Sequence, residues 1–337
     1  MAEILKICHD RILPQDLVRP QPTVDTNGRP RAVLEFRKRW INGSTLRVRF
    51  MGGTATQQAR VIEQARWWTE HANLRFEFNN APDAEIRIAF NPNDGAWSNV
   101  GTDCRLVPLN EPTMNLGFMD GGTVAHEFGH AIGLGHEHQN PSGGLQWNEA
   151  VVIRDLGGPP NFWAPDQVRF NVLEKYSTDQ IRGTTFDPDS IMLYAFPASW
   201  TRNGISTREN EVLSALDKSF IASLNGYPRT AAGVAELGIN AASSTPAAIG
   251  QPGEEDLFTF TVTREGRHIM ETGGQTDVVM KLFGPNSQTN LIAEDDDGGA
   301  GRNARIAVRL IPGRYFVQIR HFNTARGTGS YSISVKA

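Results

Sequence analysis

Three histidines and one glutamate stand close together at spacings that matter for chemistry. His126 and His130 are four residues apart, so on a helix they share one face and can direct both imidazoles at one metal ion. Glu127 can lie beside that ion without binding it and can take a proton from an activated water. Gly133 permits backbone angles that end the helix, so His136 can return as a third ligand. Three protein nitrogens and one open position predict a catalytic zinc site.

The plain alternative is a set of core or surface histidines that happen to line up. With eight histidines in the chain, His-Glu-x-x-His arises by chance in about one such chain in a hundred. The glycine and the third histidine at fixed offsets make chance much less frequent still. A second motif, Ser-Ile-Met-Leu-Tyr at 190–194, begins 60 residues after His130 and favours the metal site further.

The extended histidine pattern followed by a methionine-bearing turn resembles the metzincin metalloproteases. Within that clan, Glu137 directly after the third histidine is similar to the astacin group, whose motif ends His-Glu. The astacin turn commonly reads Ser-Ile-Met-His-Tyr, and this chain differs from it at Leu193. The resemblance covers about residues 40–228 and implies a zinc endopeptidase that acts on proteins or peptides.

The resemblance also implies a role for each matching residue. Met192 forms an apolar floor under the metal, and Tyr194 ligates zinc at rest and swings away to stabilise the oxyanion. The alternative for Tyr194 is an ordinary core tyrosine after a turn. Glu137 meets a buried mature N-terminus in activated astacins, although no cleavage point is readable in this chain. The resemblance implies that His126, His130 and His136 bind the zinc ion and that Glu127 is the general base.

One neighbouring histidine has no counterpart in the family. His138 fits no position of the astacin motif, and we expect it to be solvated.

An edge strand for the substrate is a further expectation from the resemblance. It falls on Trp97–Asp103 and would pair with an extended peptide through main-chain hydrogen bonds. The residues expected to line it are Trp97, Ser98, Val100 and Gly101. An ordinary protected edge strand is the alternative.

The cysteines depart from the astacin pattern, which usually has four cysteines in two disulfides. Here only Cys104 lies in the catalytic part, and Cys8 is the other cysteine of the chain. A thiolate of Cys8 could cap the zinc and hold the enzyme latent. A bridge between Cys8 and Cys104, or two free thiols, are the plainer alternatives.

The elements around the motif predict an α+β domain with a twisted, mostly parallel sheet and helices. Alternating apolar residues predict strands at 46–50, 74–78 and 86–90, with a helix at about 56–72 between the first two. A short strand is expected near 114–118, and the helix with the histidines begins near Thr123. Residues 139–190 are expected to be mostly loop with one helix near 166–173, and a last helix spans about 214–224.

The chain changes character after this region. We expect an extended segment at 1–40 that could be pro-like, a catalytic domain at 41–228, a linker at 229–240 and an all-β sandwich at 241–337. The last part resembles the bacterial pre-peptidase C-terminal domain, through Glu255–Phe258, Glu294–Gly299 and Pro312–Tyr315. Its acidic run, Asp295, Asp296 and Asp297, predicts either a Ca²⁺ site or a solvated turn with Asx hydrogen bonds.

The composition limits the classes of function. Lysine and arginine number 33 against 37 aspartate and glutamate residues, which argues against a nucleic-acid binder. No run of 18 apolar residues predicts a membrane span, and the first twenty residues do not make a secretory signal. We expect a monomer that acts outside the cell. The rival hypotheses are a binding or adhesion protein with a vestigial zinc site and a zinc amidase that acts on cell-wall material.

Overall fold

In the computed structural model the chain forms two compact units. The structure describes residues 34–35, 38–140, 143–159, 161–175, 181–182, 185–223, 225–229, 234–324 and 326–337. The first unit contains Leu46–Tyr227 and the described residues up to Trp40; the second contains Pro228–Ala337 and Ile41–Thr45. Within the described ranges, no helix is long and apolar enough to cross a membrane. Cys8 and nearly all of the segment 1–40 lie outside the described residues.

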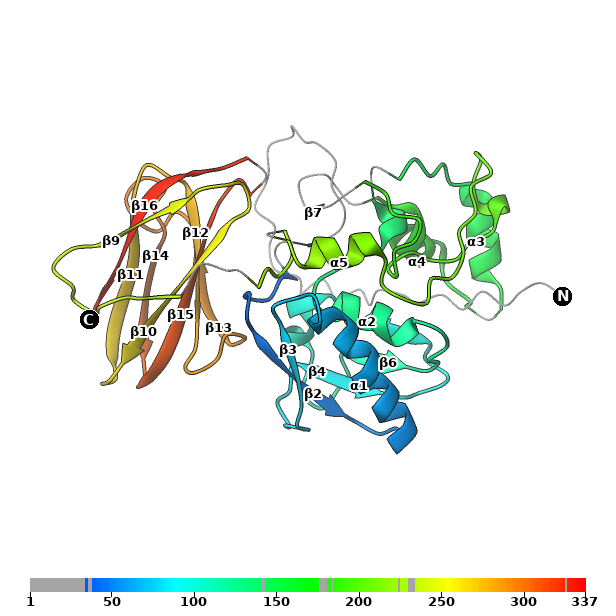
Figure 1. The fold of residues 1–337 in the computed structure, drawn as a ribbon, viewed down its shortest axis with the longest axis horizontal. Helices are drawn as coiled ribbons and strands as arrows, with labels where there is room; N and C mark the ends of the chain where they lie inside the picture. The colour runs from blue at the N-terminus through cyan, green and yellow to red at the C-terminus, as the bar shows by residue number, and fades with distance from the viewer. Residues whose placement is uncertain are drawn as a thin grey trace. The chain divides into compact units, whose positions relative to one another are not determined.

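A five-stranded sheet forms one layer of the first unit (Figure 1). Its strand order is β3 (Arg75–Phe78), β2 (Thr45–Phe50), β4 (Ile86–Ala89), β6 (Met114–Leu116) and β5 (Ala96–Ser98). The strands β2, β4 and β6 run parallel, whereas β5 pairs antiparallel with β6 at the edge. Leu46 and Val48 are fully buried, as the period-2 alternation predicts.

Two helices pack against each other and against this sheet. Helix α1 (Ala55–Thr69) begins at a capping box, in which the Thr54 hydroxyl accepts the Gln57 N–H and the Gln57 side chain accepts the Thr54 N–H. The indole N–H of Trp68 donates to the carbonyl of Ala125, 2.7 Å away in α2 (Thr123–Ala131). The histidine helix α2 is therefore held within the core of the unit.

The other elements of the first unit are η3 (Glu137–Gln139), α3 (Glu149–Gly157), α4 (Pro165–Val168), η4 (Arg169–Leu173), η5 (Ala198–Trp200), α5 (Ala215–Ile221) and the short pair β1 (Leu34–Glu35) with β7 (Ile181–Arg182). A second apolar cluster of this unit is formed in part by residues of α3, α4, η4 and η5. The sequence missed α3, which lies in the region expected to be mostly loop. Val152 and Leu156, four residues apart, are the buried face of that helix.

The second unit is a β-sandwich (Figure 1). One sheet has the order β13 (Leu291–Asp295), β12 (Val278–Phe283), β15 (Gly313–His321), β10 (Glu255–Val262) and β8 (Ala235–Glu236). The other has the order β14 (Arg305–Leu310), β11 (Gly266–Gly274), β16 (Gly329–Lys336) and β9 (Thr245–Ile249). Side chains from both sheets form one apolar core. An α+β unit followed by an all-β unit confirms the predicted fold class.

The boundary between the units differs from the predicted linker at 229–240. Residues 235–236 form β8, which pairs parallel with β10, and Ile239 bridges to Val335. Leu237 is buried in the sandwich core. This part of the expected linker is a component of the sandwich because its apolar side chains and backbone groups find partners there.

Candidate active site

Helix α2 places two histidines in the core of the first unit. Every residue from Val124 to Ala131 is buried, and the rings of His126 and His130 lie 4.8 Å apart between centroids. Gly133 has a φ of 101°, and its N–H donates to the carbonyl of His130 at 2.8 Å. This left-handed turn ends the helix and lets His136 return, with its ring centroid 4.4 Å from that of His130.

The three Nε2 atoms converge. Nε2 of His130 lies 3.1 Å from Nε2 of His126 and 3.0 Å from Nε2 of His136. Among the described residues, these three form a group whose ligand atoms all lie within 4.8 Å of one another. Neighbouring ligand nitrogens of a tetrahedral zinc ion stand about 3.3 Å apart, given Zn–N distances of about 2.0–2.1 Å. The spacing therefore fits one zinc ion.

The proton positions on these rings point to the same conclusion. Nδ1 of His126 lies 2.7 Å from the carbonyl oxygen of Ile191, and Nδ1 of His130 lies 2.8 Å from that of Leu134. A carbonyl oxygen only accepts, so each Nδ1 carries the hydrogen and each neutral ring leaves a lone pair on Nε2. Lone pairs that face each other at 3.1 Å repel, and a cation among them removes that repulsion. The donor set fits a metal ion.

Glu127 follows His126 on the same helix and is fully buried. A carboxylate on the histidine helix, in a core that excludes water, is of the type that can exchange a proton with a reacting group. Its role as the general base stays a prediction.

The 190–194 segment, here called the Met turn, packs against the middle of α2. A Cβ on Gly129 would lie 2.3 Å from Sδ of Met192 and 3.0 Å from the Trp68 ring. Glycine at this position therefore allows the methionine to approach the helix directly. The Glu137 N–H donates to the carbonyl of Met192 at 2.9 Å, so the Met turn also contacts the segment that carries the third histidine.

Tyr194 ends the Met turn with its ring among the histidines. Its hydroxyl oxygen lies 3.5 Å from Nδ1 of His136, and the two ring centroids are 4.2 Å apart. The ring of His138 also stacks on that of Tyr194, with centroids 4.3 Å apart. The expectation of a solvated His138 is wrong: the residue is fully buried, and its Nε2 lies 2.9 Å from the carbonyl oxygen of Asn171. The packing of the Met turn encloses it.

With this geometry in view, the comparison with known proteins decides the family. The family model described as "Astacin", a peptidase family, matches residues 33–219, more than half of the chain. The chain belongs to the astacin family. This confirms the resemblance drawn from the histidine and Met-turn motifs.

Individual astacin-family relatives match at moderate identity. Zinc metalloproteinase nas-30 of Caenorhabditis elegans is 28% identical over 174 residues, which cover 50% of this chain and 21% of that protein. Zinc metalloproteinase dpy-31 of Brugia malayi is 34% identical over 108 residues, which cover 31% of this chain and 17% of that protein. The chain thus spans about a fifth of the length of these curated relatives.

Two solved structures are each similar to a part of the chain. Myroilysin has a TM-score of 0.56 at 38% identity, and the match covers 59% of this chain and all of that one. The pre-peptidase C-terminal domain of a collagenase from Bacillus anthracis has a TM-score of 0.27 at 18% identity, over 31% of this chain and 95% of that one. The strand pairing of the second unit is the observation that shows a β-sandwich there.

Glu137, the astacin-type glutamate, is bound within the chain. Its Oε1 accepts the side-chain N–H of Asn140 and the backbone N–H of Asp187, both at 2.9 Å. Burial raises the pKa of Glu137 to about 7, and these two hydrogen bonds act in the opposite direction. The predicted contact with a mature N-terminus involves residues outside the described part of the chain.

The expected edge strand is shorter than predicted. Trp97 and Ser98 lie in β5 at the end of the sheet order. Val100 and Gly101 do not, because η2 (Gly101–Leu106) begins there and Gly101 has a φ of 50°. A Cβ on Gly101 would lie 1.9 Å from the carbonyl oxygen of Lys38. The close approach of that backbone turns the chain away from the strand.

Cys104 is a free, buried thiol in the core of the first unit. Burial raises its pKa well above the usual range, so it remains a thiol at neutral pH. Of the alternatives for Cys104, the structure shows the free thiol. The predicted zinc-capping role of Cys8 lies outside the described residues.

The acidic run of the sandwich closes a turn. Oδ2 of Asp295 accepts the backbone N–H of Gly298 at 2.9 Å and that of Arg305 at 2.7 Å. Within the described ranges, Asp295, Asp296 and Asp297 do not form a cluster of the kind that the three histidines form. The calcium expectation therefore finds no support, and the Asx-type turn accounts for Asp295.

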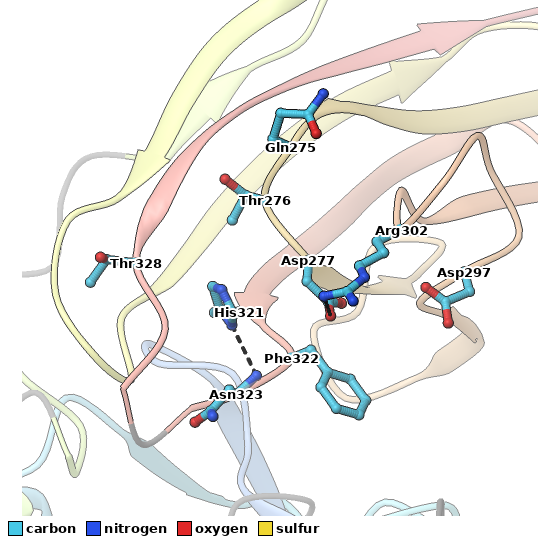
Figure 2. A pocket seen from close by; sticks show the side chains of 9 residues that line it. All are labelled: Gln275, Thr276, Asp277, Asp297, Arg302, His321, Phe322, Asn323 and Thr328. Atoms are coloured by element: carbon cyan, nitrogen blue, oxygen red, sulfur yellow. Dashed lines mark hydrogen bonds and ion pairs between the residues drawn. The ribbon is translucent and has the colours of Figure 1, made fainter.

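A hollow of about 810 Å³ lies near this turn in the sandwich (Figure 2). Arg302 and Asp277 pair across it at 3.4 Å, and the Phe322 ring is 39% exposed beside them. Nδ1 of His321 accepts the backbone N–H of Asn323 at 2.9 Å. Nothing in the predicted zinc site contributes to its lining, which is made entirely of residues of the second unit.

Sequence reasoning missed one residue behind the site, Asp217 on α5. Its carboxylate accepts the Ser190 hydroxyl at 2.7 Å and the Ile191 N–H at 2.9 Å, so it holds the start of the Met turn. No local pattern marks it, because it lies 27 residues after Ser190. The capping position of Asp217 relative to Ser214 was the only available signal, and it indicates a helix start rather than a site.

Proposed function

We propose that this astacin-family chain is a zinc-dependent endopeptidase in which His126, His130 and His136 hold the metal. The convergence of their Nε2 atoms at 3.0–3.1 Å is the observation that carries this proposal. When bound, zinc lowers the pKa of a water molecule and polarises the peptide carbonyl. The remaining chemistry falls to side chains of the protein itself.

Glu127 and Tyr194 are the two groups proposed to act on the substrate. Glu127 removes the proton from the attacking water and then delivers it to the leaving amine nitrogen. The hydroxyl of Tyr194, which lies 3.5 Å from His136 Nδ1, donates a hydrogen bond to the developing oxyanion. The family resemblance adds that this tyrosine also ligates the resting metal, and that Met192 forms the apolar floor of the site.

The substrate is proposed to be an extended polypeptide. The strand β5, with Trp97 and Ser98, is the last in the sheet order, and a peptide strand can add to such an edge through main-chain hydrogen bonds. Val100 and Gly101 would contribute only as neighbours of this strand. The extracellular location and the monomeric state stay predictions.

Digestion of unfolded casein tests the proposal. The wild-type chain should bind about one zinc ion and cleave casein, and Glu127→Ala should keep the zinc and lose cleavage. An exposed glutamate on the same unit, Glu70→Ala, is the matched control and should behave as wild type. Absence of zinc from the wild-type chain would overturn the metal site, and full activity of Glu127→Ala would overturn the assignment of the base.

The rival hypotheses predict different substrate profiles. A binding protein with a vestigial site would hold zinc and cleave nothing, whereas a cell-wall amidase would release products from peptidoglycan and leave casein intact. The presence of Glu127 in the buried core favours an active enzyme, because loss of this carboxylate is the simplest route to an inactive relative. Assays of protein, peptide and peptidoglycan side by side separate the three.

A further inference from the structure

A carboxylate outside the predicted site anchors the start of the Met turn. Oδ1 of Asp217 accepts the Ser190 hydroxyl at 2.7 Å, and Oδ2 accepts the backbone N–H groups of Ile191 and Ser214, both at 2.9 Å. Burial raises the pKa of Asp217, and these three donors act in the opposite direction, because each stabilises the ionised form. The carboxylate thus faces the Met turn as an acceptor of several hydrogen bonds.

The hydrogen bonds continue from Ser190 into the next peptide group. The Ser190 Oγ that donates to Asp217 also accepts the N–H of Met192 at 3.1 Å. The carbonyl of that same peptide group, Ile191 O, accepts the Nδ1–H of His126 at 2.7 Å. One peptide group therefore joins a serine hydroxyl on one side to a predicted zinc ligand on the other.

In this series of hydrogen bonds, every donor points the same way, from His126 toward Asp217. A serine that donates to a carboxylate becomes a better acceptor for the Met192 N–H, and a peptide whose N–H is bound presents a more negative carbonyl oxygen. That oxygen holds the Nδ1–H of His126 more strongly, which raises the basicity of Nε2 and fixes the ring orientation. The residues that contribute the Ser190 hydroxyl and the Met192 N–H are both buried, so solvent weakens these bonds little.

We propose that Asp217 is a positioning residue that strengthens zinc binding at His126 through Ser190 and the Ile191–Met192 peptide group. The proposal rests on the proposed zinc site and adds to it the residue that orients one of its ligands. It divides the histidines of α2 into two kinds. His130 is oriented locally, by the carbonyl of Leu134 four residues later, whereas His126 is oriented through a carboxylate on a distant helix.

The series of hydrogen bonds from Asp217 through Ser190 to His126 is here called the relay. The zinc affinity of the full-length protein, measured by chelator competition, tests it. Ser190→Ala removes the link and should raise the zinc dissociation constant about tenfold, as loss of an outer partner of a metal-binding histidine does. Ser190→Thr keeps the hydroxyl and should restore the affinity to within about threefold of wild type. Asp217→Asn should weaken zinc binding by about the same factor as Ser190→Ala, because both substitutions interrupt the same series of hydrogen bonds.

Ser214→Ala is the control for a merely structural effect. The Ser214 hydroxyl accepts the Asp217 N–H at 2.9 Å and caps α5, but it is not part of the path to His126. Its loss should lower the melting temperature and leave the zinc dissociation constant within about twofold of wild type. If Asp217→Asn does not fold, the Ser190→Ala and Ser190→Thr pair decides alone.

The outcomes separate this proposal from the one on which it rests. A wild-type chain that binds no zinc overturns the zinc site itself. A wild-type chain that binds zinc and cleaves casein, with Ser190→Ala binding zinc equally well, overturns only the relay. An equal loss of affinity in Ser214→Ala and Ser190→Ala also overturns it, because helix stability would then explain both.

Discussion

Two turns of the molecule are each held by an aspartate that accepts two backbone N–H groups. One is the Met turn of the first unit, and the other is the acidic turn of the sandwich at residues 295–299. Asp217 accepts those of Ile191 and Ser214, and Asp295 accepts those of Gly298 and Arg305. In the first case the carboxylate comes from another element and the turn is buried. In the second it belongs to its own turn, which is half-buried or exposed.

The difference shows that an aspartate bound to backbone N–H groups does not by itself make a functional site. The role of such an aspartate depends on which groups the backbone of its turn contacts in addition. The Met turn continues to His126 through the carbonyl of Ile191, whereas the acidic turn continues into β13 and β14. The first aspartate is therefore joined by hydrogen bonds to a proposed zinc ligand, whereas the second lies in the connection between two strands.

Removal of zinc is expected to give the largest effect, and only in the first unit. All seven tryptophans lie at or before residue 200, so tryptophan fluorescence reports on that unit. A ligand at about 1,000 times its dissociation constant stabilises the folded state by about 4 kcal/mol. Chelation should lower the thermal transition seen by tryptophan fluorescence and leave the sandwich transition, followed by calorimetry, in place. Equal shifts of both transitions would contradict an independent metal site.

The approach of the Met turn to α2 predicts the next largest effect. Gly129→Ala places a methyl group 2.3 Å from Sδ of Met192, so it should lower the free energy of unfolding by about 1–3 kcal/mol and reduce activity. Gly157→Ala, whose Cβ would lie 3.7 Å from the carbonyl oxygen of Trp163, is the control and should be nearly neutral. Urea unfolding followed by tryptophan fluorescence measures both. Similar losses in the two variants would refute the close contact.

Substitution of the two turn aspartates tests the comparison directly. Asp217→Asn should weaken zinc binding about tenfold, while Asp295→Asn should leave zinc binding unchanged and destabilise the sandwich by about 1 kcal/mol. Chelator competition and calorimetry on both full-length variants give the two readouts. Loss of zinc affinity in Asp295→Asn would show that the turns are not separate in function.

The smallest effect expected is on the pH dependence of stability. Burial raises the pKa of Asp256 in the sandwich, although the Tyr331 hydroxyl donates to it at 2.6 Å. The folded state then holds this proton more tightly than the unfolded state, so the free energy of unfolding falls as the pH rises from the unfolded pKa of about 3.9 through the raised folded value. Asp256→Asn should lack this part of the slope in calorimetry between about pH 3 and pH 7.

Asp83 in the first unit provides a control of opposite sign. Its hydrogen bond to Arg47 at 2.8 Å lowers the pKa of Asp83, so its contribution to stability is present above the unfolded pKa and is lost as the pH falls through the folded value. The side chain is 57% exposed, so solvent weakens the effect. The pH slope of the free energy of unfolding should change in opposite directions when Asp83→Asn and Asp256→Asn are each compared with wild type. Changes of the same sign would contradict the assignment.

Much of the site was predictable because its signals are local. The four-residue spacing of His126 and His130, and the glycine before His136, act within one helix and the turn that ends it. The alternation of apolar residues likewise predicted β2, β3 and β4 of the first unit. The prediction failed at Val100 and Gly101, and for His138, because backbone packing from elsewhere in the chain decides their conformation or burial.

The sequence by itself therefore determined the three histidines proposed as metal ligands, the family and the two kinds of unit. Only the tertiary structure decided that α5 supplies the aspartate behind the Met turn, that His138 stacks on Tyr194, and that Asp295 closes a turn. The physical reason is the range of the interactions. Helix and strand periodicity is set by neighbours within a few residues, whereas a hydrogen bond between Asp217 and Ile191 exists only once the whole unit has folded.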